Sequence, residues 1–290
     1  MEKRLSIWSG AGGYNARPEE MVRLIRSAGF SYCELSSRHA WEFINWSKAE
    51  RSRFRKFAES EGLLFRQGHL LNKVDLSTID QAKRQEFLDL EMRCIDLFVD
   101  LGIEAGVVHT GGWEALYQNV PLQKSREMLN KSLQALAEYT RSTSFRVCIE
   151  NCPDTVPDME TINEILTATG EENLGCCLDT GHLNISAPGA GNFIRGCGKK
   201  LLALHLNDNV GMQHEKKQEM GYWYADDLHL MPAFCKNAVD WQDTIAALNE
   251  VGYKGLWNLE VSGEFLKLPE NLRHLKLRHC FELGQALFGK

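Results

Sequence analysis

Short apolar segments alternate with amphipathic segments along the whole chain. Eight apolar runs bounded by turn residues predict buried strands, at Leu5–Trp8, Tyr32–Leu35, Leu63–Phe65 running on to His69, Ala105–His109, Val147–Glu150, Gly175–Asp179, Leu201–Leu206 and Leu256–Val261. Apolar residues at helical spacing predict helices between them, including Pro18–Ala28, Ser47–Ser60, Ile79–Leu101, Gln123–Tyr139, Asp158–Thr169 and Val239–Val251. This alternation is typical of parallel strands joined by right-handed helical crossovers.

The number of strand–helix units decides between the α/β architectures. Eight units within 290 residues predict a (β/α)8 TIM barrel rather than an open sheet. A barrel of this length usually forms one domain, so we expect residues 1–290 to be a single domain. No Gly-x-Gly-x-x-Gly pattern follows the first strand, which argues against a dinucleotide-binding fold.

Composition narrows the setting in which the protein works. The formal net charge of −6 argues against a nucleic-acid binder that relies on a broad basic face. No apolar run of about 18 residues occurs, so no membrane span is expected, and the first residues lack the apolar stretch of a secretory signal. Nine cysteines without paired spacing fit a reduced, cytoplasmic protein.

Each of the last four predicted strands closes on a residue type that binds divalent metals. These residues are Glu150, Asp179, His205 and Glu260. In a TIM barrel the carboxyl ends of the strands face one mouth, where neighbouring carboxylates would repel each other unless a cation lay between them. Ordinary ion pairs are the alternative, but no Arg or Lys ends a neighbouring strand. The pattern therefore predicts a metal centre, and mixed oxygen and nitrogen ligands suit Mn²⁺, Zn²⁺, Co²⁺ or Mg²⁺.

Further polar residues fall at the same end of the predicted barrel. Glu34 closes the second predicted strand. Additional candidates for substrate binding or for extra metal ions are His69, His109, His182, Asp227 and His229. The alternative for each histidine is a simple hydrogen-bonded role, and Asp227 and His229 could be solvated loop residues. Trp8, at the end of the first strand, is either a platform for stacking a sugar or a core residue.

Two loop segments are further candidates for a functional role. About thirty residues separate His205 from the helix near Val239, and positions 211–229 among them are rich in charged and aromatic residues. So long a loop in a compact domain is usually functional, and we expect it to lie over the mouth. The cluster Arg38–Trp46 after the second strand carries three aromatics and could be a substrate lid or an interface.

The motifs at the strand ends resemble those of the xylose isomerase-like TIM barrel superfamily, in its sugar phosphate isomerase/epimerase branch. The resemblance covers nearly the whole chain. It rests on the order and spacing of Cys33-Glu34-Leu35-Ser36, His109-Thr110-Gly111, Ile149-Glu150-Asn151, Leu178-Asp179-Thr180-Gly181-His182, His205-Leu206-Asn207-Asp208-Asn209, Val239-Asp240-Trp241 and Leu259-Glu260-Val261.

The resemblance implies a metal-dependent isomerase or epimerase of a sugar or sugar derivative. Glu150, Asp179, His205 and Glu260 would hold the metal, which favours a cis-enediolate. Glu150 and Glu260 would also remove and return the substrate proton as paired carboxylates, and His182 would hold a substrate oxygen. The expected partner is a small carbohydrate, and aromatic residues in the two loops are compatible with a homodimer.

The same superfamily includes the endonuclease IV-type nucleases, which cut DNA at apurinic sites with three zinc ions. This chain resembles them too, because the positions of their ligands are filled by His69, His109, Glu150, Asp179, His182, His205, Asp227, His229 and Glu260. A multi-zinc phosphodiesterase is therefore the alternative, and a non-catalytic metabolite binder is a third hypothesis. The segment after His205 lacks the arginine of the ketose 3-epimerases, and Pro232 is followed by Ala233 and Phe234 rather than by glycines.

Overall fold

Eight parallel strands form one sheet that curls into a barrel. The computed structural model describes residues 3–213 and 225–289. The strands are β1 Arg4–Trp8, β2 Tyr32–Leu35, β3 Leu64–His69, β4 Ala105–Val108, β5 Arg146–Glu150, β6 Leu174–Asp179, β7 Leu201–His205 and β8 Leu256–Leu259. They are hydrogen-bonded in the order β7-β6-β5-β4-β3-β2-β1-β8, and a parallel bridge between Leu206 and Leu259 closes the circle. The predicted TIM barrel is confirmed.

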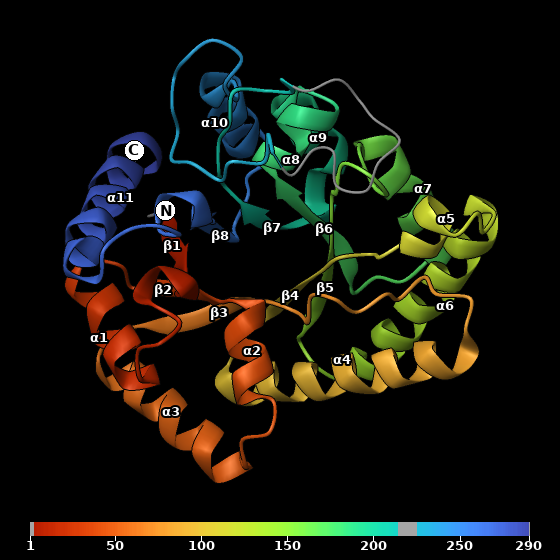
Figure 1. The fold of residues 1–290 in the computed structure, drawn as a ribbon, viewed down its shortest axis with the longest axis horizontal. Coiled ribbons are helices and arrows are strands. Elements are labelled where there is room, and N and C mark those ends of the chain that lie inside the picture. The colour runs from red at the N-terminus through yellow and green to blue at the C-terminus, as the bar shows by residue number, and fades with distance from the viewer. Residues whose placement is uncertain (1–2, 214–224, 290) are drawn as a thin grey trace.

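Helices surround the sheet, as Figure 1 shows. They are α1 Pro18–Ser27, α2 Ser37–Phe43, α3 Lys48–Ser60, α4 Gln81–Leu101, α5 Trp113–Tyr117, α6 Leu122–Thr140, α7 Met159–Thr169, α8 Thr180–Ser186, α9 Ala190–Cys197, α10 Trp241–Glu250 and α11 Arg273–Phe288. Helix α11 lies beside β1, so the two ends of the described chain meet on one side of the barrel (Figure 1). Within the described residues, no helix is both long and apolar enough to cross a membrane.

The chemistry of the helix ends explains why the predicted helices form where they do. Ser47 and Glu50 make a reciprocal capping box at the start of α3. Asp80 accepts hydrogen bonds from two backbone N–H groups of the first turn of α4. Gly102 ends α4 with a φ of 81°, in the left-handed region that glycine enters without a steric cost. Caps and stops of this kind are visible in the sequence, and the predicted ranges agree with the observed helices to within about two residues.

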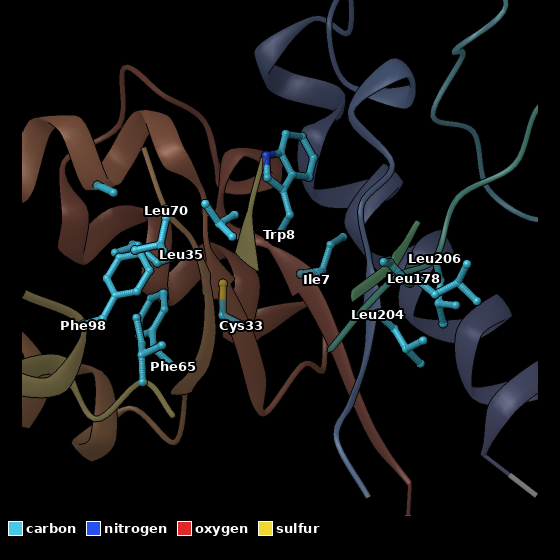
Figure 2. Close-up of a cluster of buried hydrophobic side chains, with 14 of the residues drawn as sticks. Ile7, Trp8, Cys33, Leu35, Phe65, Leu70, Phe98, Leu178, Leu204 and Leu206 are labelled. Atoms are coloured by element: carbon cyan, nitrogen blue, oxygen red, sulfur yellow. The ribbon is translucent and has the colours of Figure 1, made fainter. Parts of the chain in front are cut away.

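The main hydrophobic core lies between the strands and the surrounding helices. Figure 2 shows part of it, with Ile7, Cys33, Phe65 and Phe98 among the labelled side chains. A second, small cluster consists of Val107, Cys148, Cys177 and Ala203, one residue from each of β4 to β7. All nine cysteines are free and eight of them are buried, where a free cysteine packs as a small hydrophobic residue.

The segment after β7 is only partly described, because residues 214–224 lie outside the described ranges. Its described part is organised by the buried carboxylate of Asp208. One oxygen of Asp208 accepts hydrogen bonds from the backbone N–H of Asn209 at 2.8 Å and of Val239 at 3.0 Å. The other accepts from the backbone N–H of Ala233 at 2.9 Å and from Trp241 Nε1 at 2.7 Å. Asp208 thus connects the segment after β7 to the Val239-Asp240-Trp241 motif at the start of α10.

Candidate metal centre and active site

Four side chains from neighbouring strand ends converge at the floor of the barrel mouth. Glu150, Asp179, His205 and Glu260 each place a potential ligand atom within 4.8 Å of the others. Glu150, Asp179 and His205 end β5, β6 and β7, whereas Glu260 lies one residue beyond β8. The expected grouping of these four residues is therefore present, and its ligands are carboxylate oxygens and one imidazole nitrogen.

His205 stands at the middle of this group and is completely buried. Its Nδ1 lies 3.0 Å from Glu150 Oε1 and 3.0 Å from Glu260 Oε2. Its Nε2 lies 3.1 Å from Glu34 Oε1. The two ring nitrogens therefore face different carboxylates, with Nδ1 directed toward the cluster.

Asp179 is fixed from several sides. It caps α8, because its Oδ1 accepts the backbone N–H of His182 at 2.7 Å. Its Oδ2 accepts a hydrogen bond from Asn207 Nδ2 at 2.8 Å. Asn151 holds its backbone through two hydrogen bonds, of 2.8 Å to the N–H and 3.0 Å to the carbonyl. Asn151 and Asn207 were not among the predicted site residues, although both belong to the strand-end motifs of the sequence.

A second group of potential ligands consists of His69, His109 and Glu150. Glu150 Oε2 lies 3.0 Å from His109 Nε2 and 3.5 Å from His69 Nε2. Nevertheless, within residues 3–213 and 225–289 no hydrogen bond satisfies this buried oxygen. A buried carboxylate oxygen without a hydrogen bond carries a large cost, which a cation would remove.

A third group consists of Asp179, His182 and His229, with Asp227 beside it. Asp227 Oδ2 lies 3.0 Å from His229 Nε2 and 3.5 Å from His182 Nε2. His229 adopts a φ of 46°, a conformation that costs energy for a residue other than glycine. Asp227 and His229 thus lie in the candidate site, and the predicted polar candidates all gather at the mouth of the barrel.

Charge interactions inside the cluster shift its protonation equilibria strongly. Burial opposes the ionised form of Glu260, but His205 and His229 outweigh it and lower the pKa of Glu260 to about 2. Burial likewise opposes the charged form of His229, but Asp227 and Glu260 raise its pKa to about 10. Burial raises the pKa of Asp179 to about 6, with His182 acting against it. Glu260 and His229 are therefore held in opposite charge states.

The chemistry of this donor set suits a divalent cation. The first group, Glu150, Asp179, His205 and Glu260, offers three carboxylates and one imidazole as potential ligands, and all four are buried or nearly so. A cation placed among them would supply the positive charge that protonated histidines otherwise supply. Glu150 Oε2 lies 3.0 Å from His109 Nε2 but makes no hydrogen bond of good geometry within the described residues, so a cation would also satisfy this oxygen.

A cavity of about 290 Å³ opens above the cluster. Its lining includes His69, His109, His182, His229 and the two carboxylates Glu150 and Glu260. Trp8 also lines the cavity but is only 5% exposed, and it packs edge-on against Phe265 with ring centroids 5.6 Å apart. Trp8 is therefore mainly a core residue that presents part of its surface to the cavity.

The cluster after β2 divides between core and cavity. Phe43 and Trp46 stack with ring centroids 3.8 Å apart, and Phe43 is buried, so these two aromatics pack inward. Arg38 lines the cavity, with its guanidinium carbon 4.4 Å from the ring centre of Tyr14. Tyr14 also lines the cavity and accepts a hydrogen bond from Trp8 Nε1 at 3.1 Å. Tyr14 was not among the predicted site residues, because no strand-end pattern marks it.

The chain is similar to a protein family and to several known proteins. The family model described as "Xylose isomerase-like TIM barrel" matches residues 22–278. The uncharacterized protein y4fM of Sinorhizobium fredii (strain NBRC 101917 / NGR234) is 21% identical, over 93% of this chain and 90% of its own length.

Solved structures are similar over nearly the whole chain. D-psicose 3-epimerase with D-tagatose, from Clostridium cellulolyticum H10, has a TM-score of 0.79 at 15% identity and covers 100% of both chains. The IolI protein with a bound zinc atom has a TM-score of 0.78 at 16% identity, with 99% of this chain and 98% of that chain covered. At these identities the structures show that the fold is shared.

Proposed function

We propose that this chain, which belongs to the xylose isomerase-like TIM barrel family, is an epimerase or isomerase of a sugar or sugar derivative. The observation that carries the proposal is the convergence of Glu150, Asp179, His205 and Glu260 into one group of potential metal ligands, two of which, Glu150 and Glu260, line the cavity. The similar solved structures include an epimerase bound to the sugar D-tagatose, which supports a carbohydrate substrate. The cytoplasmic location and the homodimer stay predictions from the sequence.

Glu150, Asp179, His205 and Glu260 would hold one divalent cation, either Mn²⁺, Zn²⁺, Co²⁺ or Mg²⁺. The zinc atom bound by the similar IolI protein supports a bound metal ion in this chain as well. When bound, such a cation supplies positive charge that stabilises negative charge developing on the oxygens of the substrate. Asn151 and Asn207 would keep Asp179 in position for this role.

Glu150 and Glu260 would move the substrate proton. Both carboxylates line the cavity, where each could reach a bound substrate and accept or donate a proton. One glutamate would remove the proton next to the carbonyl, and the other would return it through an enediolate. This exchange inverts a carbon or moves the carbonyl, according to where the proton returns.

The remaining cavity residues would orient the sugar. His182 lines the cavity beside Asp179 and would hold a substrate oxygen. His69 and His109 lie on the other side of Glu150 and offer further polar contacts. The exposed part of Trp8 offers an apolar surface to the carbon skeleton.

A panel of ketoses and aldoses, incubated with the protein and each candidate metal, tests the proposal. We expect at least one sugar to be converted to its epimer or isomer, and we expect chelation of the metal to stop the conversion. Glu260→Gln removes the proposed base, and Glu282→Gln on α11 is a matched control because Glu282 is exposed and pairs with Arg278 at the surface. Loss of turnover in both variants would contradict the role given to Glu260.

A multi-zinc phosphodiesterase is the second candidate. The specific observation in its favour is that His69, His109 and Glu150, and also Asp179, His182 and His229, form two further groups of potential ligands. The net charge of −6 weighs against tight binding of a DNA backbone. Cleavage of DNA at an apurinic site, with about three bound zinc ions per chain, would favour this candidate over the epimerase.

A further inference from the structure

The carboxylate of Glu34 contacts the candidate metal centre from behind. Glu34 lies on β2 and is completely buried. Its Oε1 lies 3.1 Å from Nε2 of His205, which ends β7. Strands β2 and β7 are not neighbours in the sheet, so this contact spans the interior of the barrel.

The second oxygen of Glu34 is held by two amide side chains. Gln67 Nε2 donates to Glu34 Oε2 at 2.5 Å, and Asn258 Nδ2 donates a short hydrogen bond to the same oxygen. Gln67 also donates to the carbonyl of Leu204, the residue before His205, at 3.1 Å. Gln67 and Asn258 are themselves buried. Two amide donors and one imidazole nitrogen therefore surround Glu34, a setting that suits a carboxylate because a carboxylate only accepts.

We infer that Glu34 is a positioning residue that fixes the tautomer and the orientation of His205. A hydrogen bond from Nε2–H to Glu34 leaves the lone pair on Nδ1, which is the nitrogen 3.0 Å from Glu150 and Glu260. A carboxylate that accepts the second N–H of a ligand histidine also makes that histidine a better ligand. The inference rests on the proposed function, because it concerns the metal held at that site.

The arrangement explains why the support comes from across the barrel. His205 is completely buried, so water cannot supply the acceptor for its Nε2–H. Gln67 comes from β3, which is the neighbour of β2. Asn258 comes from β8, which is the neighbour of β1. Their two hydrogen bonds together hold the carboxylate of Glu34 in one orientation. A carboxylate on a flexible surface side chain would lack this restraint.

A purely structural role for Glu34 makes a different prediction. In that case its loss would lower the free energy of unfolding of the metal-free protein and leave the affinity of the folded protein for metal unchanged. The positioning role instead predicts weaker metal binding by protein that is still folded. Metal affinity therefore separates the two roles.

The test uses Glu34→Gln, which keeps the size of the side chain and removes its charge. Its amide can no longer accept from all three donors. We expect the affinity of the metal-free protein for Zn²⁺, measured by competition with a chromophoric chelator, to fall about 10- to 100-fold. Glu91→Gln is the control for placing an amide at a completely buried glutamate, because Glu91 lies outside the groups of potential ligands and accepts a hydrogen bond from the backbone N–H of Leu71.

The outcomes separate failure of the inference from failure of the proposed function. Wild-type affinity in Glu34→Gln, or an equal loss in Glu91→Gln, would overturn the inference while leaving the metal centre intact. Absence of Zn²⁺ binding by the wild type would overturn the proposed metal centre itself. Weaker binding in Glu34→Gln without any sugar turnover by the wild type would support the inference and count against the epimerase.

A second measurement covers the case in which Glu34→Gln does not fold. Nitrogen-15 NMR of the zinc-loaded wild-type protein reports which ring nitrogen of His205 carries the proton. We expect the proton on Nε2 and the metal on Nδ1. A proton on Nδ1, or a metal on Nε2, would overturn the inference.

Discussion

Glu150 and Glu260 place one carboxylate oxygen each at 3.0 Å from the same atom, Nδ1 of His205. Glu150 ends β5 and Glu260 follows β8, so β6 and β7 separate their strands in the barrel wall. A single imidazole therefore brings together two acids that are 110 positions apart in the chain. The proposed function depends on this relationship, because the two proposed proton carriers then share one metal and one substrate carbon.

Replacement of Asp179 should weaken metal binding directly. In Asp179→Asn the ligand loses its charge, while Asn151 still holds the backbone. We expect the affinity for Zn²⁺ to fall by more than the roughly 10- to 100-fold expected for a residue that only supports a ligand. The matched control is Asp243→Asn on α10, because Asp243 pairs with Arg195 at the surface. Unchanged affinity in Asp179→Asn would remove this residue from the proposed metal shell.

The number of bound metal ions should separate the two candidate functions. For the mononuclear epimerase, elemental analysis of His109→Ala should still find about one ion per chain, because His109 is outside the first ligand group. For the multi-zinc phosphodiesterase, the same variant should lose one ion relative to the wild type. Three ions in the wild-type protein would count against the epimerase.

Glu91 should make stability depend on pH in a way that a glutamine does not. Burial raises the pKa of Glu91 to about 8, from an ordinary value of 4.5. Between these values the folded state keeps a proton that the unfolded state has released, so wild-type stability falls as pH rises through this range. Glu91→Gln removes the effect and should raise the free energy of unfolding by about 3 kcal/mol at pH 7. The gain should vanish near pH 4.5, as urea unfolding at both pH values can show; equal gains would contradict the assignment.

Removal of the Asp208 carboxylate should loosen the segment after β7. Asp208→Ala leaves the backbone N–H groups of Val239 and Ala233 and the indole N–H of Trp241 without their acceptor. Each unsatisfied buried donor costs roughly 1–3 kcal/mol, so we expect a clear loss of thermal stability. Trp241→Phe, which removes only one donor, should cost less in hydrogen bonding. Hydrogen exchange should quicken first in residues 225–240, and unchanged exchange there would show that Asp208 does not hold this segment.

Much of the fold and of the site could be predicted from the sequence because the signals are local. Buried strands are apolar, and the residues that close them fall together when parallel strands form a barrel. His69 and His109 were predicted on this basis. His182 was predicted from the turn after Asp179, and Asp227 and His229 from the long loop after His205, and the structure brings all five to one cavity.

The role of Glu34 could not be predicted, because its partner His205 is 171 positions away and lies across the barrel. Tyr14 reaches the cavity from a segment without a strand-end pattern. The alternatives for Trp8 could be resolved only from its contacts with Phe265 and Tyr14. Long-range packing decided these three cases, and no local pattern in the sequence encodes it.

Solvent exchange tests the central claim most directly, namely that Glu150 and Glu260 transfer a proton to and from a metal-bound sugar. The metal-loaded protein is incubated with the sugar panel in deuterated water, and deuterium next to the carbonyl carbon is followed by NMR. We predict incorporation in at least one sugar, its loss after chelation of the metal, and its loss in Glu150→Gln and in Glu260→Gln. Absence of incorporation in every sugar, together with cleavage of apurinic-site DNA by the same preparation, would contradict the account.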